Sequence, residues 1–82
     1  MMTINDAVAR RIIKLLIEKN ITQYRLEKKS GVQHGAMNRI LAGKNKTITM
    51  TTLYRIAKGF DMTLIEFLND SIFDESKVNY ED

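Results

Sequence analysis

The sequence predicts an all-α domain of five short helices, and three observations indicate this fold class. Apolar residues recur at three- and four-residue spacing along most of the chain. Proline is absent, so nothing interrupts a succession of helices. Residues that cap or close helices stand between the periodic segments. Strict alternation of apolar and polar residues, which would indicate a strand, is confined to residues 47–50 and is too short for a sheet.

The first helix is expected from Asn5 to about residue 19. One face of it is apolar, and the basic residues of the opposite face are expected to be solvated: Arg10, Arg11 and Lys14. Asn20 can close this helix in the left-handed conformation, and Thr22 can cap a second helix of about two turns that ends before Gly31. The two helices are therefore separated by a short turn.

Three further helices follow. One is expected from about Gln33 to Leu41 and ends at Gly43. Thr49 can cap the next helix, which is expected to bury Met50, Leu53, Ile56, Ala57 and Phe60. Thr63 can cap the last helix together with Glu66 three residues later, and its apolar face is formed by Leu64, Phe67 and Leu68.

Length and charge indicate one domain with a polyanionic partner. The chain has 82 residues and no cysteine, so packing alone must stabilise one small core. Residues 1–68 hold 12 of the 13 Lys and Arg but 5 of the 10 Asp and Glu, a net charge of +7. Residues 69–82 hold the other five acidic residues and one lysine. This asymmetry divides the chain into a basic body, residues 1–68, and an acidic C-terminal tail, residues 69–82.

Other classes of protein find little support. No apolar segment is long enough for a bilayer and no secretion signal is visible, so we expect a cytoplasmic protein with no membrane association. His34 is the only histidine, so we expect no metal site and no cofactor. The chain has no nucleophile elbow, phosphate loop or paired catalytic carboxylates, and we do not expect an enzyme.

Two stretches of the chain resemble a known family. Residues 22–32, followed by Met37-Asn38-Arg39-Ile40 and Gly43-Lys44, resemble the helix-turn-helix of the Cro and phage-repressor type (XRE) family, and residues 52–58 and 62–68 resemble its fourth and fifth helices. The resemblance implies a compact five-helix bundle of the lambda-repressor-like type. It also implies a sequence-specific transcription regulator of bacterial or phage type, most simply a repressor, whose third helix enters the major groove of an operator in double-stranded DNA.

Four residues of the third helix are expected to meet base edges: Gln33, His34, Asn38 and Arg39. Arg39 has two open roles, a bidentate pair with guanine or a phosphate contact. The Gln33 amide suits adenine, and it could also cap its own helix. Gly35 has no side chain and would allow the backbone to approach DNA closely.

Phosphate contacts are expected at two places. Thr22 and Gln23 open the second helix, where unpaired amides and the helix dipole attract an anion. Lys44, Asn45 and Lys46 form a basic loop after the third helix. The roles of Lys28 and Lys29 stay open.

The chain departs from the family pattern at two positions of the second helix. Glu27 replaces a small alanine, and Ser30 replaces a larger apolar residue. Because an unpaired buried charge is costly, Glu27 is expected to point toward solvent or a basic neighbour.

The sequence also leads us to expect contacts with other protein chains. A single recognition helix reads few base pairs, so a homodimer is expected. Its surfaces would be the fifth helix and the apolar residues of the tail, although these could equally pack within the chain: Ile72, Phe73, Val78 and Tyr80. The acidic tail could compete with DNA for the basic body. The alternative function is an antitoxin-like or regulator-binding module that contacts a protein instead of DNA.

Overall fold

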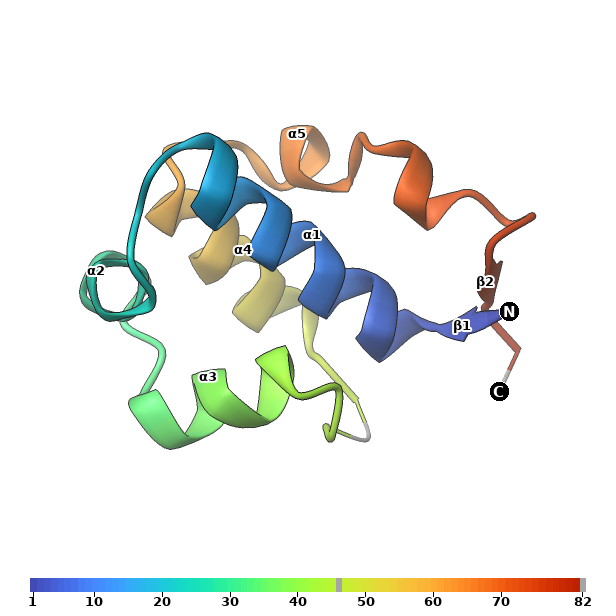
Figure 1. Ribbon diagram of the computed structural model, residues 1–82, viewed down its shortest axis with the longest axis horizontal. Coiled ribbons are helices and arrows are strands. Elements are labelled where there is room, and N and C mark those ends of the chain that lie inside the picture. Colours follow the sequence, from blue (N-terminus) through green and yellow to red (C-terminus); the bar gives the residue numbers. More distant parts are fainter. Residues whose placement is uncertain (46, 82) are drawn as a thin grey trace.

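The computed structural model describes residues 1–45 and 47–81, and Figure 1 shows their arrangement. The five α-helices that it contains confirm the predicted fold class. In chain order the elements are β1 (Met2–Thr3), α1 (Ile4–Glu18), α2 (Gln23–Ser30), α3 (His34–Leu41), α4 (Met50–Gly59), α5 (Leu64–Leu68), a 3₁₀ turn (Ser71–Phe73) and β2 (Val78–Asn79).

Threonine side chains begin four of the five helices. Thr3, Thr22, Thr49 and Thr63 each accept a hydrogen bond from the backbone N–H three residues ahead, which satisfies a donor that the helix leaves unpaired. At α5 the Glu66 carboxylate also accepts from the backbone N–H of Thr63 at 2.8 Å and completes the expected capping box. The three caps predicted from the sequence are confirmed, and Thr3 moves the start of α1 to Ile4.

Left-handed residues follow three of the helices as predicted, and Gly43 does so after α3 with a φ of 69°. Asn20 follows α1 with a φ of 53°. Gly31 has a φ of 75° and its N–H donates to the Glu27 carbonyl at 2.9 Å, which ends α2 and turns the chain sharply into α3. Val32, which is buried in this turn, fixes the angle between α2 and α3 by packing into the core.

The core lies between α1 and the other four helices. α1 packs against α3, while α2 and α5 pack against α4 (Figure 1). The largest fully buried side chains include one or more from every helix: Ile12, Leu26, Met37, Ile40, Ile56, Phe60 and Phe67. No helix in the described part of the chain combines the length and the apolar composition needed to cross a membrane.

The prediction that α4 buries Met50 is wrong, since this side chain is 62% exposed. Met50 is the first residue of α4, so it lies at the outer end of the apolar face that begins with Leu53. Ile48 of the preceding segment packs against the core at this end of the helix.

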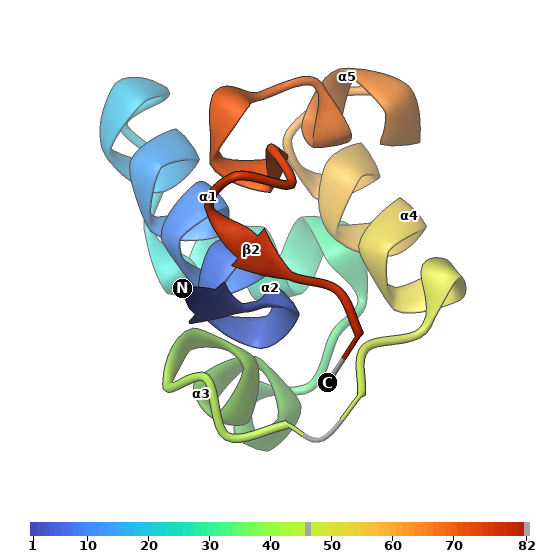
Figure 2. The same ribbon diagram turned by 90° about the vertical axis from the view of Figure 1, so that its right-hand side faces the viewer.

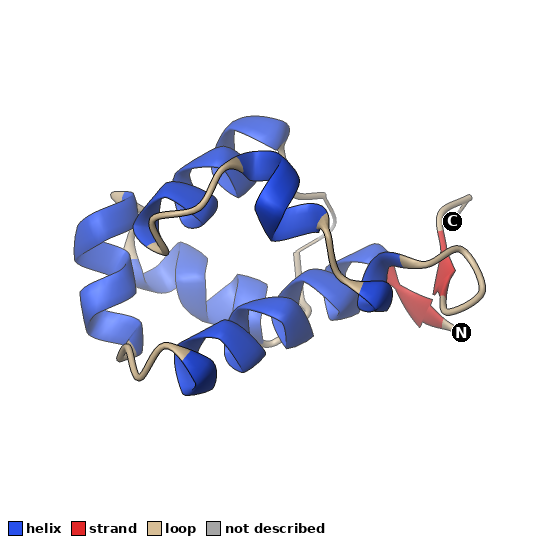
Figure 3. Ribbon diagram, turned by 90° about the horizontal axis from the view of Figure 1, so that it is seen from above, coloured by secondary structure: helices blue, strands red, loops and turns tan. Residues whose placement is uncertain are grey.

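The two ends of the chain meet in a small parallel strand pair that the periodicity did not predict. Met2 lies opposite Val78 and Thr3 opposite Asn79, at one end of the molecule (Figures 2 and 3). Val78 is 2% exposed and Phe73 packs against the core. The tail of this chain thus packs on its own N-terminal segment and α1.

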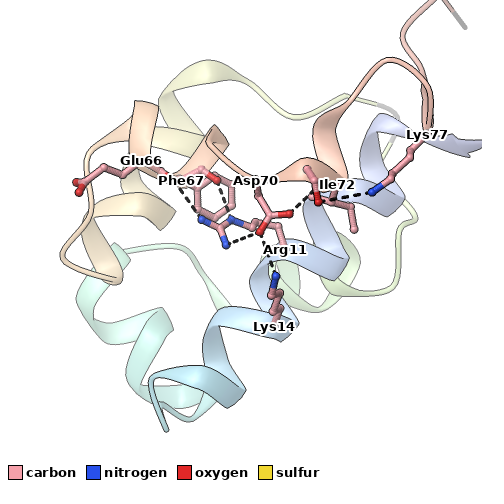
Figure 4. A network of polar contacts seen from close by, with 8 residues as sticks. Arg11, Lys14, Glu66, Phe67, Asp70, Ile72 and Lys77 are labelled. Atoms are coloured by element: carbon pink, nitrogen blue, oxygen red, sulfur yellow. Dashed lines mark hydrogen bonds and ion pairs between the residues drawn. The ribbon is translucent and has the colours of Figure 1, made fainter.

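Arg11 corrects a second prediction, because it is buried instead of solvated. Its Nε donates to the Phe67 carbonyl at 2.8 Å, its Nη2 to the Glu66 carbonyl at 3.1 Å and its Nη1 to Asp70 Oδ2 at 3.0 Å (Figure 4). The last turn of a helix leaves carbonyl groups without intrahelical partners, and the guanidinium supplies a donor for the Phe67 carbonyl. It adds a second donor at the Glu66 carbonyl, which also accepts from the Asn69 N–H. Lys14, whose side chain is 57% exposed, adds a second ion pair with Asp70 at 3.2 Å.

Candidate nucleic-acid interface

α3 presents a polar outer face and an apolar inner face. His34, Asn38 and Arg39 are exposed, whereas Met37 and Ile40 are buried. The helical repeat produces this division, because residues three and four apart share a face. Three of the four residues predicted to meet bases thus lie together on the outside of this helix.

The fourth, Gln33, occupies the N-cap position of α3 and is exposed. Its side chain forms no capping hydrogen bond. Of the two roles that the sequence left open, the capping role is therefore not realised in this structure, and the amide remains available to an outside partner.

Gly35 and Arg39 are neighbours one helical turn apart. A Cβ atom added at Gly35 would lie 3.8 Å from Nη1 of Arg39, so the guanidinium lies back along α3 over the glycine. Gly35 adds no side chain of its own to this surface, so the backbone of α3 could approach a ligand closely where the Arg39 side chain moves aside.

Four side chains link α2 to α3 in a closed hydrogen-bonded ring, which we call the Glu27 ring: Gln23, Glu27, His34 and Asn38. Nε2 of Gln23 donates to Glu27 Oε2 at 2.8 Å and to Asn38 Oδ1 at 2.7 Å. Nδ1 of His34 lies 2.8 Å from the same Glu27 Oε2, and Nδ2 of Asn38 lies 3.1 Å from His34 Nε2. Three of these residues are predicted to contact DNA. Glu27, for which no DNA contact is predicted, links them into one ring.

Glu27 points toward a basic neighbour, His34, which is one of the two alternatives that we expect from the sequence, and not into open solvent. Its side chain is 10% exposed and contacts the Gln23 amide and the His34 imidazole. The hydrogen bond from Gln23, followed by that from His34, holds the pKa of this carboxyl below its ordinary value of 4.5. The carboxylate therefore stays ionised at neutral pH and acts only as an acceptor.

A sequence signal for this ring existed. Gln23 and Glu27 are four residues apart on α2, and His34 and Asn38 are four apart on α3, which is the spacing at which helical side chains meet. The contact between the two pairs depends on the angle of the turn at Gly31. That angle cannot be read from spacing alone.

The residues predicted to contact phosphate lie at two separate places. Thr22 caps α2 through its hydroxyl and is exposed, and Gln23 is the first helical residue. Lys44 is exposed after α3, and the carbonyl of Asn45 accepts a hydrogen bond from the Asn5 side chain, which ties this loop to α1. Lys46 lies outside the described residues.

Two lysines whose role was open have partners within the chain. Lys28 lies over the Tyr24 ring, with its Nζ 5.3 Å from the centroid. Lys29 forms an ion pair with Asp61 at 2.7 Å, and its hydrogen bond lowers the pKa of that carboxyl. Arg10, in contrast, is exposed on α1 as predicted.

A comparison with protein families decides between the helical bundles that this geometry could represent. The family model of the Cro/C1-type HTH DNA-binding domain matches residues 11–71. The chain belongs to this family. In this Cro/C1-type domain, α2 and α3 are the two helices of the helix-turn-helix. The match leaves residues 1–10 and most of the tail, residues 72–82, outside. The searches of curated proteins and of solved structures found no match.

Proposed function

We propose that this Cro/C1-type domain is a sequence-specific transcription repressor that inserts α3 into the major groove of an operator. The observation that carries the proposal is the exposure of His34, Asn38 and Arg39 on one face of α3. An α-helix fits the major groove, and amide and guanidinium groups match the base edges presented there. The operators of bacteria and phages lie in the cytoplasm, which is where we expect this protein to act.

Each exposed residue has a chemical role in this proposal. Asn38 and Gln33 carry amides that can pair with adenine, and Arg39 can pair with guanine or hold a phosphate. His34 lies beside Asn38 and would face the same base pairs. Gly35 would let the backbone of α3 come close to the groove.

Backbone contacts would hold the helix in register. The N-terminus of α2, with Thr22 and Gln23, directs amides and the positive end of a dipole outward. Lys44, Asn45 and Lys46 would meet phosphates on the other side of α3. The basic balance of residues 1–68 supports this polyanionic partner.

A homodimer would extend the DNA sequence that is read. The eight residues of α3 rise about 12 Å, which spans about four base pairs, whereas two copies could read half-sites about 34 Å apart. α5 is the surface that we propose for the contact, because Ile65 on it is 79% exposed. Sedimentation equilibrium of Ile65→Lys should show a weaker dimer, with Ile17→Lys on α1 as the matched variant; loss of the dimer only in the latter would move the contact to α1.

The test of DNA recognition is binding to duplex DNA from the protein's own promoter region and to unrelated DNA across a salt series. Wild type should bind the promoter DNA more tightly, and Arg39→Ala should reduce affinity at least about fivefold. Arg10→Ala is the matched control, because it removes the same charge from the exposed face of α1. It should change binding to both DNAs equally.

Two results would contradict the proposal. Equal, weak binding to both DNAs by wild type and Arg39→Ala would remove operator recognition and favour a protein partner instead. Selective binding without a fall in transcription from the same promoter in vitro would retain the DNA contact and remove repression.

A further inference from the structure

The carboxylate of Glu27 sets the direction of every hydrogen bond in the Glu27 ring. A carboxylate can only accept, so both groups at its Oε2 must donate. Gln23 must therefore turn its NH₂ toward Glu27, and His34 must carry a proton on Nδ1. The neutral imidazole then has Nε2 free to accept, and this atom faces the NH₂ of Asn38.

The ring reaches Asn38 along two arms, one through Gln23 and one through His34. Both arms require the same orientation of the Asn38 amide. In the first arm, the second N–H of the Gln23 amide donates to Asn38 Oδ1, which must be the acceptor. Through His34, the acceptor Nε2 requires the Asn38 nitrogen as donor. A flip of the Asn38 amide would place two donors together in one arm and two acceptors together in the other.

Asn38 keeps half of its hydrogen-bonding capacity after these contacts. Its oxygen has two lone pairs and its nitrogen two hydrogens, and the ring uses one of each. One acceptor and one donor remain on an exposed side chain. Adenine presents the complement in the major groove, an N6–H donor beside the N7 acceptor.

We infer that Glu27 is a positioning residue that fixes the Asn38 amide through both arms of the ring and so sets a preference for adenine at the base pair that Asn38 meets. This inference rests on the proposed DNA recognition. Glu27 would not touch DNA itself, because its side chain is 10% exposed and its Oε2 is occupied by Gln23 and His34. Glu27 would thus influence which base is preferred without contacting the DNA.

The first test selects binding sequences from a pool of duplexes with a randomised central segment. Asn38→Ala identifies the position that Asn38 reads. At that position Glu27→Ala should lose at least about fivefold of the preference for adenine, with the other positions unchanged. Glu27→Ala also removes a negative charge, which should raise the affinity for every DNA sequence by the same factor. The measured quantity is therefore the preference for adenine over the other bases and not the affinity.

Two variants separate positioning from charge. Glu27→Gln loses the charge, but its amide oxygen can take the place of Oε2 and accept from both Gln23 and His34, so the adenine preference should persist. Glu75→Ala removes a negative charge from an exposed side chain of the tail and should leave every preference unchanged. Thermal unfolding of Glu27→Ala checks that the variant folds, as alanine in a helix should allow.

The second test uses the free protein. Nitrogen chemical shifts of the His34 ring should show the proton on Nδ1 in wild type and in Glu27→Gln, and a change of this pattern in Glu27→Ala. A proton on Nε2 in neutral wild type, or an unchanged adenine preference in Glu27→Ala, would overturn the inference while operator recognition stands. If wild type selects no sequence at all, the proposed function and the inference both fail, and the ring nitrogens still report whether Glu27 orients His34.

Discussion

Nε of Arg11 donates a hydrogen bond of 2.8 Å to the Phe67 carbonyl, 56 residues away in the chain. The guanidinium also contacts the Phe67 ring, with its central carbon 5.7 Å from the centroid, and reaches Asp70 (Figure 4). One buried side chain of α1 thereby fixes the end of α5 and the start of the tail. The stability of the domain should therefore depend on this contact.

Asp70→Ala should lower the free energy of unfolding by about 1–3 kcal/mol, because it leaves the buried Arg11 guanidinium without its carboxylate. The matched change Lys14→Ala removes the exposed partner of the same carboxylate and should cost about 0–1 kcal/mol. Urea unfolding of both variants measures the difference. Equal losses would show that the buried pair contributes no more than the exposed one.

Stability at low pH should depend on the same carboxylate. The backbone N–H of Ile72 donates to Asp70, and Lys14 and Arg11 add to the effect, so the pKa of Asp70 is lowered from 3.8 on folding. A group with a lowered pKa stabilises the fold fully above its unfolded value, and this contribution is lost as the pH falls through the folded value. The stability difference between wild type and Asp70→Asn should hold above a pH of about 4 and shrink below it. A difference that is constant from pH 6 to about pH 2 would contradict the assignment.

Two glycines should respond oppositely to alanine. A Cβ at Gly59 would lie 2.8 Å from Leu26 Cδ1 and 3.1 Å from Ser30 Cβ, where α2 packs on α4, so Gly59→Ala should lower the free energy of unfolding by about 1–3 kcal/mol. At Gly35 the nearest atom is 3.8 Å away, so Gly35→Ala should raise stability by up to about 1 kcal/mol. Gly35→Ala should nevertheless weaken DNA binding. Unchanged affinity in this stable variant would exclude close approach of the backbone to DNA.

Lys44→Ala should weaken binding to all duplexes by a similar factor. The slope of log K against log salt should become shallower by about one, since one phosphate contact is lost. Lys77→Ala is the control of equal charge, because this exposed lysine lies in the tail. A slope that does not change in Lys44→Ala would place Lys44 in solvent instead of on a phosphate.

The sequence predicted the helices because their ends are encoded locally. Thr22, Thr49 and Thr63 cap through bonds that span three residues, and Asn20 and Gly31 close helices by their own backbone conformation. Such features need no knowledge of the rest of the fold. The same holds for the division of α3 into a polar and an apolar face.

Apart from Met50, which lies at the exposed end of its helix, the errors concern contacts between distant segments. Arg11 follows the charge pattern of a solvated face, and its partners on α5 are defined only once the helices pack. The strand pair has two residues on each side, too few to produce a periodic pattern. Glu27 could be recognised as unusual, but its contact with His34 depends on the geometry of the turn at Gly31.

The strand pair between β1 and β2 also bears on the order in which the molecule assembles. Contacts that are distant in sequence carry the largest loss of chain entropy when a loop closes, and this pair joins residues from nearly opposite ends of the sequence. Helices α1 to α5 can form and dock without it, so the strands should pair last and separate first. Native-state hydrogen exchange should detect this local opening at the Met2 amide, which donates to the Lys77 carbonyl, before the amides of α1 and α4 lose protection.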